Sequence, residues 1–199
     1  MLFMNILYLS IYISTPRVLL PNSIGQFNMK VYRFQDSNKL HDWKACVLYS
    51  NVIEDNMPLR IHDQCITSEV FGSLRCDCNE QLQKSMNLIK NNGMIIYLPN
   101  EGRGIGLYNK ILTYKLQECD YDTFESCDVL NLPYENRDYN IIPTILNDFK
   151  IKSVNLITNN NYKIKKLERS NIKINKIINL NSTINKYNKK YIETKYKKN

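Results

Sequence analysis

The stretch MIIYLPNEGRGIGLYNKILTYKLQE, Met94–Glu118, joins two periodic runs through a glycine-rich loop. The apolar run at 94–98 predicts a short buried strand, and residues 107–118 carry apolar side chains at helical spacing. A strand that leads through a loop into a helix is the repeating unit of layered α/β proteins. The stretch therefore predicts the α/β fold class. The helix positions expected to pack are Leu107, Ile111, Tyr114 and Leu116.

The rest of the chain fits the same class. Strands are predicted at 25–34, 45–53, 59–62 and 154–158, with a turn at 54–58. A helix is predicted at 79–92, where Leu82, Met86 and Ile89 share a face and Gly93 ends it. No repeat or long linker interrupts the pattern. We predict mixed β-sheets layered with helices in one domain, 17–180, after an apolar N-terminal extension, 1–16, and before a basic, partly ordered tail, 181–199.

The composition is that of an ordinary globular protein, with 43% hydrophobic and 23% charged residues among 199. The formal net charge is +8, and residues 181–199 supply five of these charges through six lysines and one glutamate. Such a tail could bind nucleic acid or a small anion, or it could have no binding role. The apolar residues 1–16 are fewer than the roughly 20 of a membrane span and lack the features of a secretory signal. We therefore expect a cytoplasmic protein without membrane contact, whose cysteines are reduced and available to metals.

Three of the six cysteines, Cys65, Cys76 and Cys78, crowd into one stretch, IHDQCITSEVFGSLRCDC at 61–78. This spacing differs from the paired C-x2-C knuckles of zinc ribbons. Three thiolates suit a catalytic zinc whose fourth position is open to water. A structural zinc would need a fourth protein ligand, for which His62, Cys119 and Cys127 are candidates. From spacing alone, catalytic zinc, structural zinc and no metal all remain open.

Three further motifs are ambiguous when taken singly. Glycines 102, 104 and 106 fit neither the dinucleotide fingerprint nor a P-loop, although a glycine turn before a helix, with Arg103, suits an anion. PYENRDYN, 133–140, could be a polar loop with surface ion pairs. LITNNNYK, 156–163, could be a strand that ends at a site or at an ordinary turn.

Together, these motifs resemble the GTP cyclohydrolase II family, which opens GTP at the start of riboflavin biosynthesis. The resemblance covers about residues 21–197 and implies a single GTP cyclohydrolase II-like domain. It rests on RIHDQC at 60–65, SLRCDC at 73–78 with Gln81, NEGRGIGLYNK at 100–110, YDT at 121–123, RDY at 137–139, LITNN at 156–160 with Lys163, and YIETK at 191–195.

The resemblance implies one Zn²⁺ per subunit, held by Cys65, Cys76 and Cys78 with water as the fourth ligand. It implies that Arg137 is the nucleophile, Glu135 the proton acceptor and Tyr114 a participant in turnover. The implied GTP contacts are Arg60, Ile61, His62, Asp63, Gln64, Gln81, Glu101, Gly102, Arg103, Thr123, Thr158 and Lys163.

The reaction implied by the resemblance begins with attack of zinc-activated water on C8 of guanine. The imidazole ring opens, formate leaves, and the α–β phosphate linkage breaks to release pyrophosphate, with Mg²⁺ on the triphosphate. The product is 2,5-diamino-6-(5-phosphoribosylamino)pyrimidin-4(3H)-one. The resemblance also implies a homodimer and no nucleic-acid partner. Because a guanidinium is protonated at ordinary pH, Arg137 could equally act as an electrostatic clamp.

The chain departs from the family pattern at several positions. Glu135 stands where the family usually has Asp, Asp63 stands where it usually has Ser, and residues 124–131 differ. Two alternatives follow: a drifted homologue with incomplete turnover, or a zinc-stabilised protein that binds nucleic acid through its tail.

Overall fold

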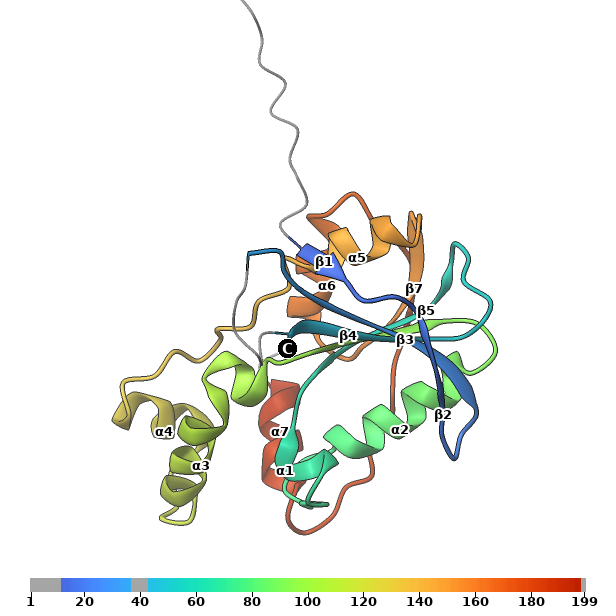
Figure 1. Cartoon of the computed structure of the whole chain (residues 1–199). Helices are drawn as coiled ribbons and strands as arrows, with labels where there is room; N and C mark the ends of the chain where they lie inside the picture. The colour runs from blue at the N-terminus through green and yellow to red at the C-terminus, as the bar shows by residue number, and fades with distance from the viewer. Residues whose placement is uncertain (1–11, 37–42, 198–199) are drawn as a thin grey trace, which may run out of the picture.

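A computed structural model describes residues 12–36 and 43–197 of the chain. Within these ranges, eight strands form one twisted sheet that helices cover on both faces (Figure 1). This confirms the predicted α/β class with mixed strand directions and helical layers.

The sheet combines an antiparallel part with a parallel part. Strands β1 to β4 pair antiparallel, β4 also pairs antiparallel with β6, and β5 to β8 contribute the parallel pairs. The order is β1-β3-β4-β6-β5-β7-β8, with β2 also on β3. The strands are β1 (Tyr12–Ser14), β2 (Val18–Pro21), β3 (Gln26–Phe34), β4 (Trp43–Tyr49), β5 (Met57–Asp63), β6 (Met94–Leu98), β7 (Ser153–Ile157) and β8 (Lys173–Ile178).

In the described residues, helices are interspersed with the strands along the sequence. They are α1 (Ile66–Glu69), α2 (Cys78–Ile89), the 3-10 turn η1 (Glu101–Gly104), α3 (Gly106–Gln117), α4 (Thr123–Val129), α5 (Ile142–Asp148), α6 (Asn161–Glu168) and α7 (Lys189–Lys197). Among them, none is both long enough and apolar enough to cross a bilayer.

The core has one apolar cluster on each face of the sheet. On one face, Ile89 of α2 is buried against Phe27 and Ile95, and Leu82 and Met86 pack beside it, which confirms the predicted packing face of this helix. On the other face, α5 and α6 bury side chains against β5 and β7 in the larger cluster. Burying these apolar side chains stabilises each layer by roughly 1.5–3 kcal/mol per large residue.

The parallel strands create a natural binding position. The chain leaves β5 towards α2 on one face, whereas it leaves β7 towards α6 on the opposite face. Neighbouring parallel strands whose connections diverge in this way leave a crevice outside their carboxyl ends. Asp63 ends β5, Asn100 follows β6 and Thr158 follows β7, so these residues surround that crevice.

Several predicted boundaries need correction. The strand predicted at 45–53 ends at Tyr49, and β5 begins at Met57, inside the predicted turn. The packing predicted for Leu107 and Ile111 is wrong, because they are 37% and 47% exposed while α3 buries Lys110 and Thr113 instead. That helix faces a polar cavity and not the apolar core.

The two predicted appendages contain regular structure. Strand β1 lies inside the predicted extension and pairs with β3, while residues 1–11 of that extension lie outside the described residues. In the predicted tail, α7 forms and Ile192 is buried. The domain boundaries themselves stay predictions.

Candidate active site

A cavity of about 540 Å³ opens at the carboxyl ends of β5, β6 and β7. All of the predicted metal, substrate and catalytic residues line it except Ile61 and Glu135. The side chain of Ile61 lies in the core, although its carbonyl oxygen accepts a hydrogen bond from Lys163 Nζ at 2.8 Å. Glu135 is not among the lining residues but contacts Arg137, which is.

The three clustered cysteines meet at one end of the cavity. Cys65 precedes α1, and Cys76 and Cys78 flank the start of α2. Their Sγ atoms all lie within 4.8 Å of one another, and those of Cys65 and Cys76 are 3.7 Å apart. Tetrahedral zinc with Zn–S bonds near 2.3 Å places its sulfurs roughly 3.8 Å apart. The donor set and its spacing therefore fit zinc.

No fourth protein ligand accompanies these thiols among the described residues. His62 is buried, its Nε2 lies 2.8 Å from Glu69 Oε1, and its ring stacks on Tyr97. Cys119 is exposed, and Cys127 lines the cavity without joining the cluster. The arrangement thus favours three protein ligands and an open fourth position.

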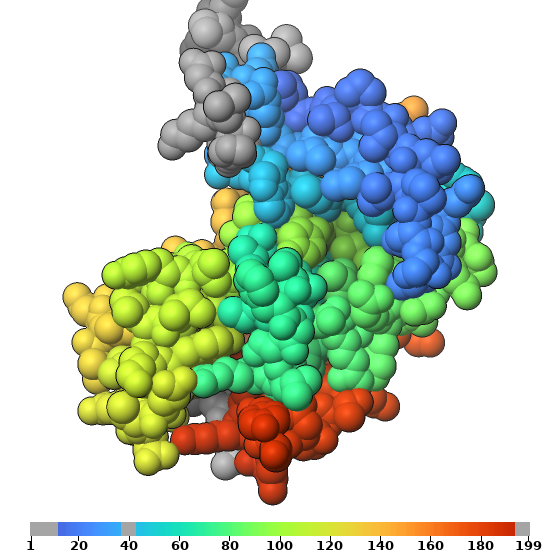
Figure 2. Space-filling view, turned by 60° about the horizontal axis from the view of Figure 1, so that its bottom comes forward, coloured from blue at the N-terminus to red at the C-terminus, as the bar shows by residue number. Residues whose placement is uncertain are grey.

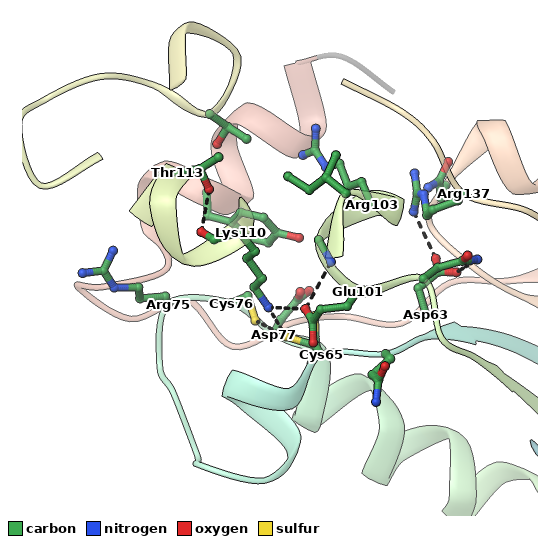
Figure 3. A pocket seen from close by; sticks show the side chains of 18 of the residues that line it. Asp63, Cys65, Arg75, Cys76, Asp77, Glu101, Arg103, Lys110, Thr113 and Arg137 are labelled. Atoms are coloured by element: carbon green, nitrogen blue, oxygen red, sulfur yellow. Dashed lines mark hydrogen bonds and ion pairs between the residues drawn. The ribbon is translucent and has the colours of Figure 1, made fainter. Parts of the chain in front are cut away.

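Lys110 of α3 reaches into the cluster of the three cysteine thiols (Figure 3). Its Nζ lies 3.1 Å from Cys65 Sγ, 3.0 Å from Thr67 Oγ1 and 2.6 Å from Glu101 Oε1. Burial lowers the pKa of Lys110, but Tyr114, Glu101 and Cys65 raise it more, so the net shift is upward. Hydrogen bonds from the neighbouring cysteine thiols, together with this ammonium, lower the pKa of Cys65. Lys110 therefore favours the thiolate form that a metal requires.

The glycine-rich turn, residues 101–104, contacts both the cysteine end of the cavity and the loop that carries Arg137. The Glu101 carboxylate accepts a hydrogen bond from the Ile66 backbone N–H at 2.7 Å, next to Cys65. Gly104 has φ +87°, and a Cβ there would lie 2.3 Å from the Asn136 carbonyl oxygen. Asn136 donates its backbone N–H to the Arg103 carbonyl at 2.9 Å. Only glycine allows this close approach, which fixes the loop that carries Arg137.

The second end of the cavity holds a cluster of buried charges. Asp63 Oδ2 lies 2.8 Å from Lys163 Nζ and 3.1 Å from an Arg137 amino group. Arg137 also donates its Nε–H to Glu135 at 2.7 Å. Burial lowers the pKa of Arg137, but Glu135, Tyr139 and Asp63 together raise it by more than burial lowers it. The guanidinium therefore stays charged. At Lys163, burial lowers the pKa by more than the nearby Asp63 carboxylate raises it, so the pKa falls to about 8.

A chain of buried hydrogen bonds links the end of β7 to the loop that carries Cys76 and Cys78. Arg60 donates to Gln81 Oε1 at 2.5 Å and to the Ile157 carbonyl at 3.1 Å. Gln81 in turn donates to Asp77 Oδ2 at 2.5 Å, between two of the clustered cysteines. The network holds the start of α2 against the end of β7.

The remaining predicted residues occupy the cavity walls. Thr158 lies beyond β7, where its Oγ1 accepts the Asn160 N–H at 3.0 Å. Tyr114 lies beneath Arg75, whose guanidinium is 4.8 Å from the ring centroid. Thr123 begins α4, Gln64 follows β5, and both line the cavity.

Comparison with known sequences identifies the family of the chain. The sequence model described as GTP cyclohydrolase II matches residues 14–179. The chain belongs to the GTP cyclohydrolase II family. It is 41% identical over 177 residues to GTP cyclohydrolase-2 of Campylobacter hominis, covering 88% of each chain. It is 41% identical over 179 residues to the protein of that name from Picrophilus torridus, covering 88% of this chain and 91% of the relative. The riboflavin biosynthesis protein RibBA of Staphylococcus saprophyticus is 42% identical over 183 residues, which are 92% of this chain and 46% of that protein.

The sequence interpretation missed several cavity residues. On α3, the missed Lys110, Thr113 and Gln117 line the cavity together with the predicted Tyr114, at the i, i+3, i+4, i+7 spacing of one helix face. This polar stripe could have been found from the sequence. Asn100, which donates to Asp63 at 3.0 Å, and four residues of the tail were also missed.

Proposed function

We propose that the chain hydrolyses GTP, releasing formate and pyrophosphate and forming 2,5-diamino-6-(5-phosphoribosylamino)pyrimidin-4(3H)-one. The observation that carries this proposal is the sharing of one cavity by the three-thiol cluster and the Lys163–Asp63–Arg137 charges. A reaction that opens a base and cleaves a triphosphate needs both kinds of group in one pocket.

The metal end would act on the guanine base. Cys65, Cys76 and Cys78 would hold Zn²⁺, which would supply Lewis-acid activation of water for attack on C8. Lys110 holds Cys65 as a thiolate, and Glu101 keeps Lys110 in place through its 2.6 Å ion pair. Arg60 and Gln81 also line the cavity and would form the wall beside the base.

The charged end would bind the triphosphate, which would arrive as its Mg²⁺ complex. Thr158 follows β7, Lys163 lies in the first turn of α6, and both line the cavity, where they would supply a hydroxyl and an ammonium. The contacts of Arg137 with Asp63 and Glu135 support a role as a charged clamp on the transferring phosphoryl group. They favour this role over that of a nucleophile, which would require a neutral guanidine.

One assay tests the activity directly. Purified protein is incubated with GTP and Mg²⁺, and formate, pyrophosphate and the diaminopyrimidine are measured separately. We expect all three from the wild type and from Cys119→Ser, an exposed cysteine outside the cavity, and none from Cys76→Ser. Formate without pyrophosphate would indicate a drifted homologue with incomplete turnover. Absence of all three products, combined with salt-sensitive RNA binding, would overturn the proposal.

The cellular context remains part of the proposal. We expect a cytoplasmic homodimer with one Zn²⁺ per subunit and no nucleic-acid partner. Light scattering after size exclusion measures whether the protein is a dimer, and metal analysis measures the zinc content per subunit.

A further inference from the structure

The C-terminal segment 180–192 begins where the family match ends, at residue 179, yet it forms part of the cavity. In Figure 2 this segment, in red, lies against the surface of α1 and α2, in teal and green. Four of its residues line the cavity, namely Lys186, Tyr187, Lys190 and Tyr191.

Hydrogen bonds fasten the start of this segment to the body of the protein. The Leu180 carbonyl and N–H both bond the side chain of Asn159, at 2.6 and 2.8 Å. Thr183 bonds the Glu80 carboxylate through its N–H at 2.9 Å and its hydroxyl at 2.7 Å. Ser182 donates to Asp77, which lies between Cys76 and Cys78. The segment is thereby bonded both to the region around Cys76 and Cys78 and to the loop after β7.

A local turn then directs the chain into α7. The side chain of Asn188 is buried, its Oδ1 accepts the Asn185 N–H at 2.8 Å, and its Nδ2 donates to the Thr183 carbonyl at 2.9 Å. Ile192, one helical turn later, is also buried. These two anchors on either side of residues 189–191 set which side of α7 faces the cavity.

The side chains that reach the cavity have the chemistry of a nucleotide-binding wall. Lys186 and Lys190 carry ammonium groups, and the Lys186 Nζ lies 4.9 Å from the centroid of the Tyr187 ring. Tyr191 lies near the metal end: burial and the nearby Cys78 and Cys76 raise its pKa. A triphosphate carries several negative charges, and ammonium groups bind phosphate as compact point charges.

We propose that Lys186, Tyr187, Lys190 and Tyr191 form a substrate-binding wall, in which Lys186 and Lys190 bind the phosphates of GTP. This deepens and rests on the proposed function, because it names the part of the substrate that the C-terminal segment recognises. It also gives the basic tail a role inside the cavity. The tail charges that suggested nucleic-acid binding are, at these two positions, directed to the nucleotide pocket.

The test compares lysines of the same segment. Lys189 is exposed on α7 but does not line the cavity, so Lys189→Ala is the matched control for Lys190→Ala and Lys186→Ala. Hydrogen bonds to charged groups contribute about 1.5–3 kcal/mol, so each cavity variant should raise KM for GTP about tenfold or more. Inorganic pyrophosphate should inhibit these variants correspondingly less, and Lys190→Arg should restore most of the affinity. Zinc content should stay unchanged in all of them.

Two results would overturn the inference while leaving the proposed function intact. One is a wild type that turns over GTP, with cavity variants whose KM equals that of Lys189→Ala. The other is a loss confined to kcat. Calorimetric titration with GTP separates these from failure of the proposed function: a wild type that neither binds nor turns over GTP removes both proposals.

Discussion

Replacing Lys110 with methionine tests how the protein holds its metal ligands. Methionine keeps an unbranched apolar stem but removes the ammonium that contacts Cys65, Glu101 and Thr67. The Lys110 and Glu101 side chains are only 10% and 6% exposed. Removing one partner of a buried ion pair costs roughly 3–5 kcal/mol, because the remaining charge is uncompensated. Loss of a hydrogen bond to a metal ligand typically weakens metal affinity about 10–100-fold.

Two measurements on Lys110→Met separate these effects. Urea unfolding of the metal-free protein reports the free energy of unfolding, and chelator competition reports the Kd for zinc. We expect a loss of about 3–5 kcal/mol in the first and a rise of about 10–100-fold in the second.

The double variant Lys110→Met/Glu101→Gln is the matched control. It removes both charges, so part of the lost unfolding free energy should return. Zinc affinity should remain low, because the N–H···S contact to Cys65 is still missing. A single variant that binds zinc like the wild type would refute the role given to Lys110. So would a double variant that regains full zinc affinity.

Four further outcomes follow from the site. Lys163, with a pKa of about 8 in the folded protein, should lose its charge above that pH, so kcat/KM for GTP should fall there in the wild type but not in Lys163→Arg. Because the folded pKa lies below the ordinary 10.5, this group should add stability as pH rises from 8 towards 10.5, measurable by urea unfolding. Glu135→Asp should retain pyrophosphate release, since a shorter carboxylate can still accept the Arg137 N–H in an Asx turn; a tenfold loss would contradict this. Metal analysis should find zinc in Cys127→Ala and none in Cys78→Ala, and the reverse pattern would show a different ligand set.

The sequence by itself determined the fold class and nearly half of the residues that line the cavity. Period-two and period-3.6 patterns are local, so β6, α2 and α3 could be placed from their own residues. Cys76 and Cys78 are two residues apart, and the glycine turn lies between a strand and its helix, so these groups were also readable locally.

The tertiary structure alone decided the contacts between distant segments. Lys110 lies 45 residues from Cys65 and Lys163 lies 102 residues from Ile61, and both pairs depend on the order of strands in the sheet. The same holds for α7, whose lysines give a basic tail by sequence and a cavity wall by structure. Leu107 and Ile111 show the converse, because apolar spacing predicts a buried helix face but cannot say what lies opposite it. Opposite α3 lies a polar cavity, since the crevice forms where the connections after β5 and β7 diverge.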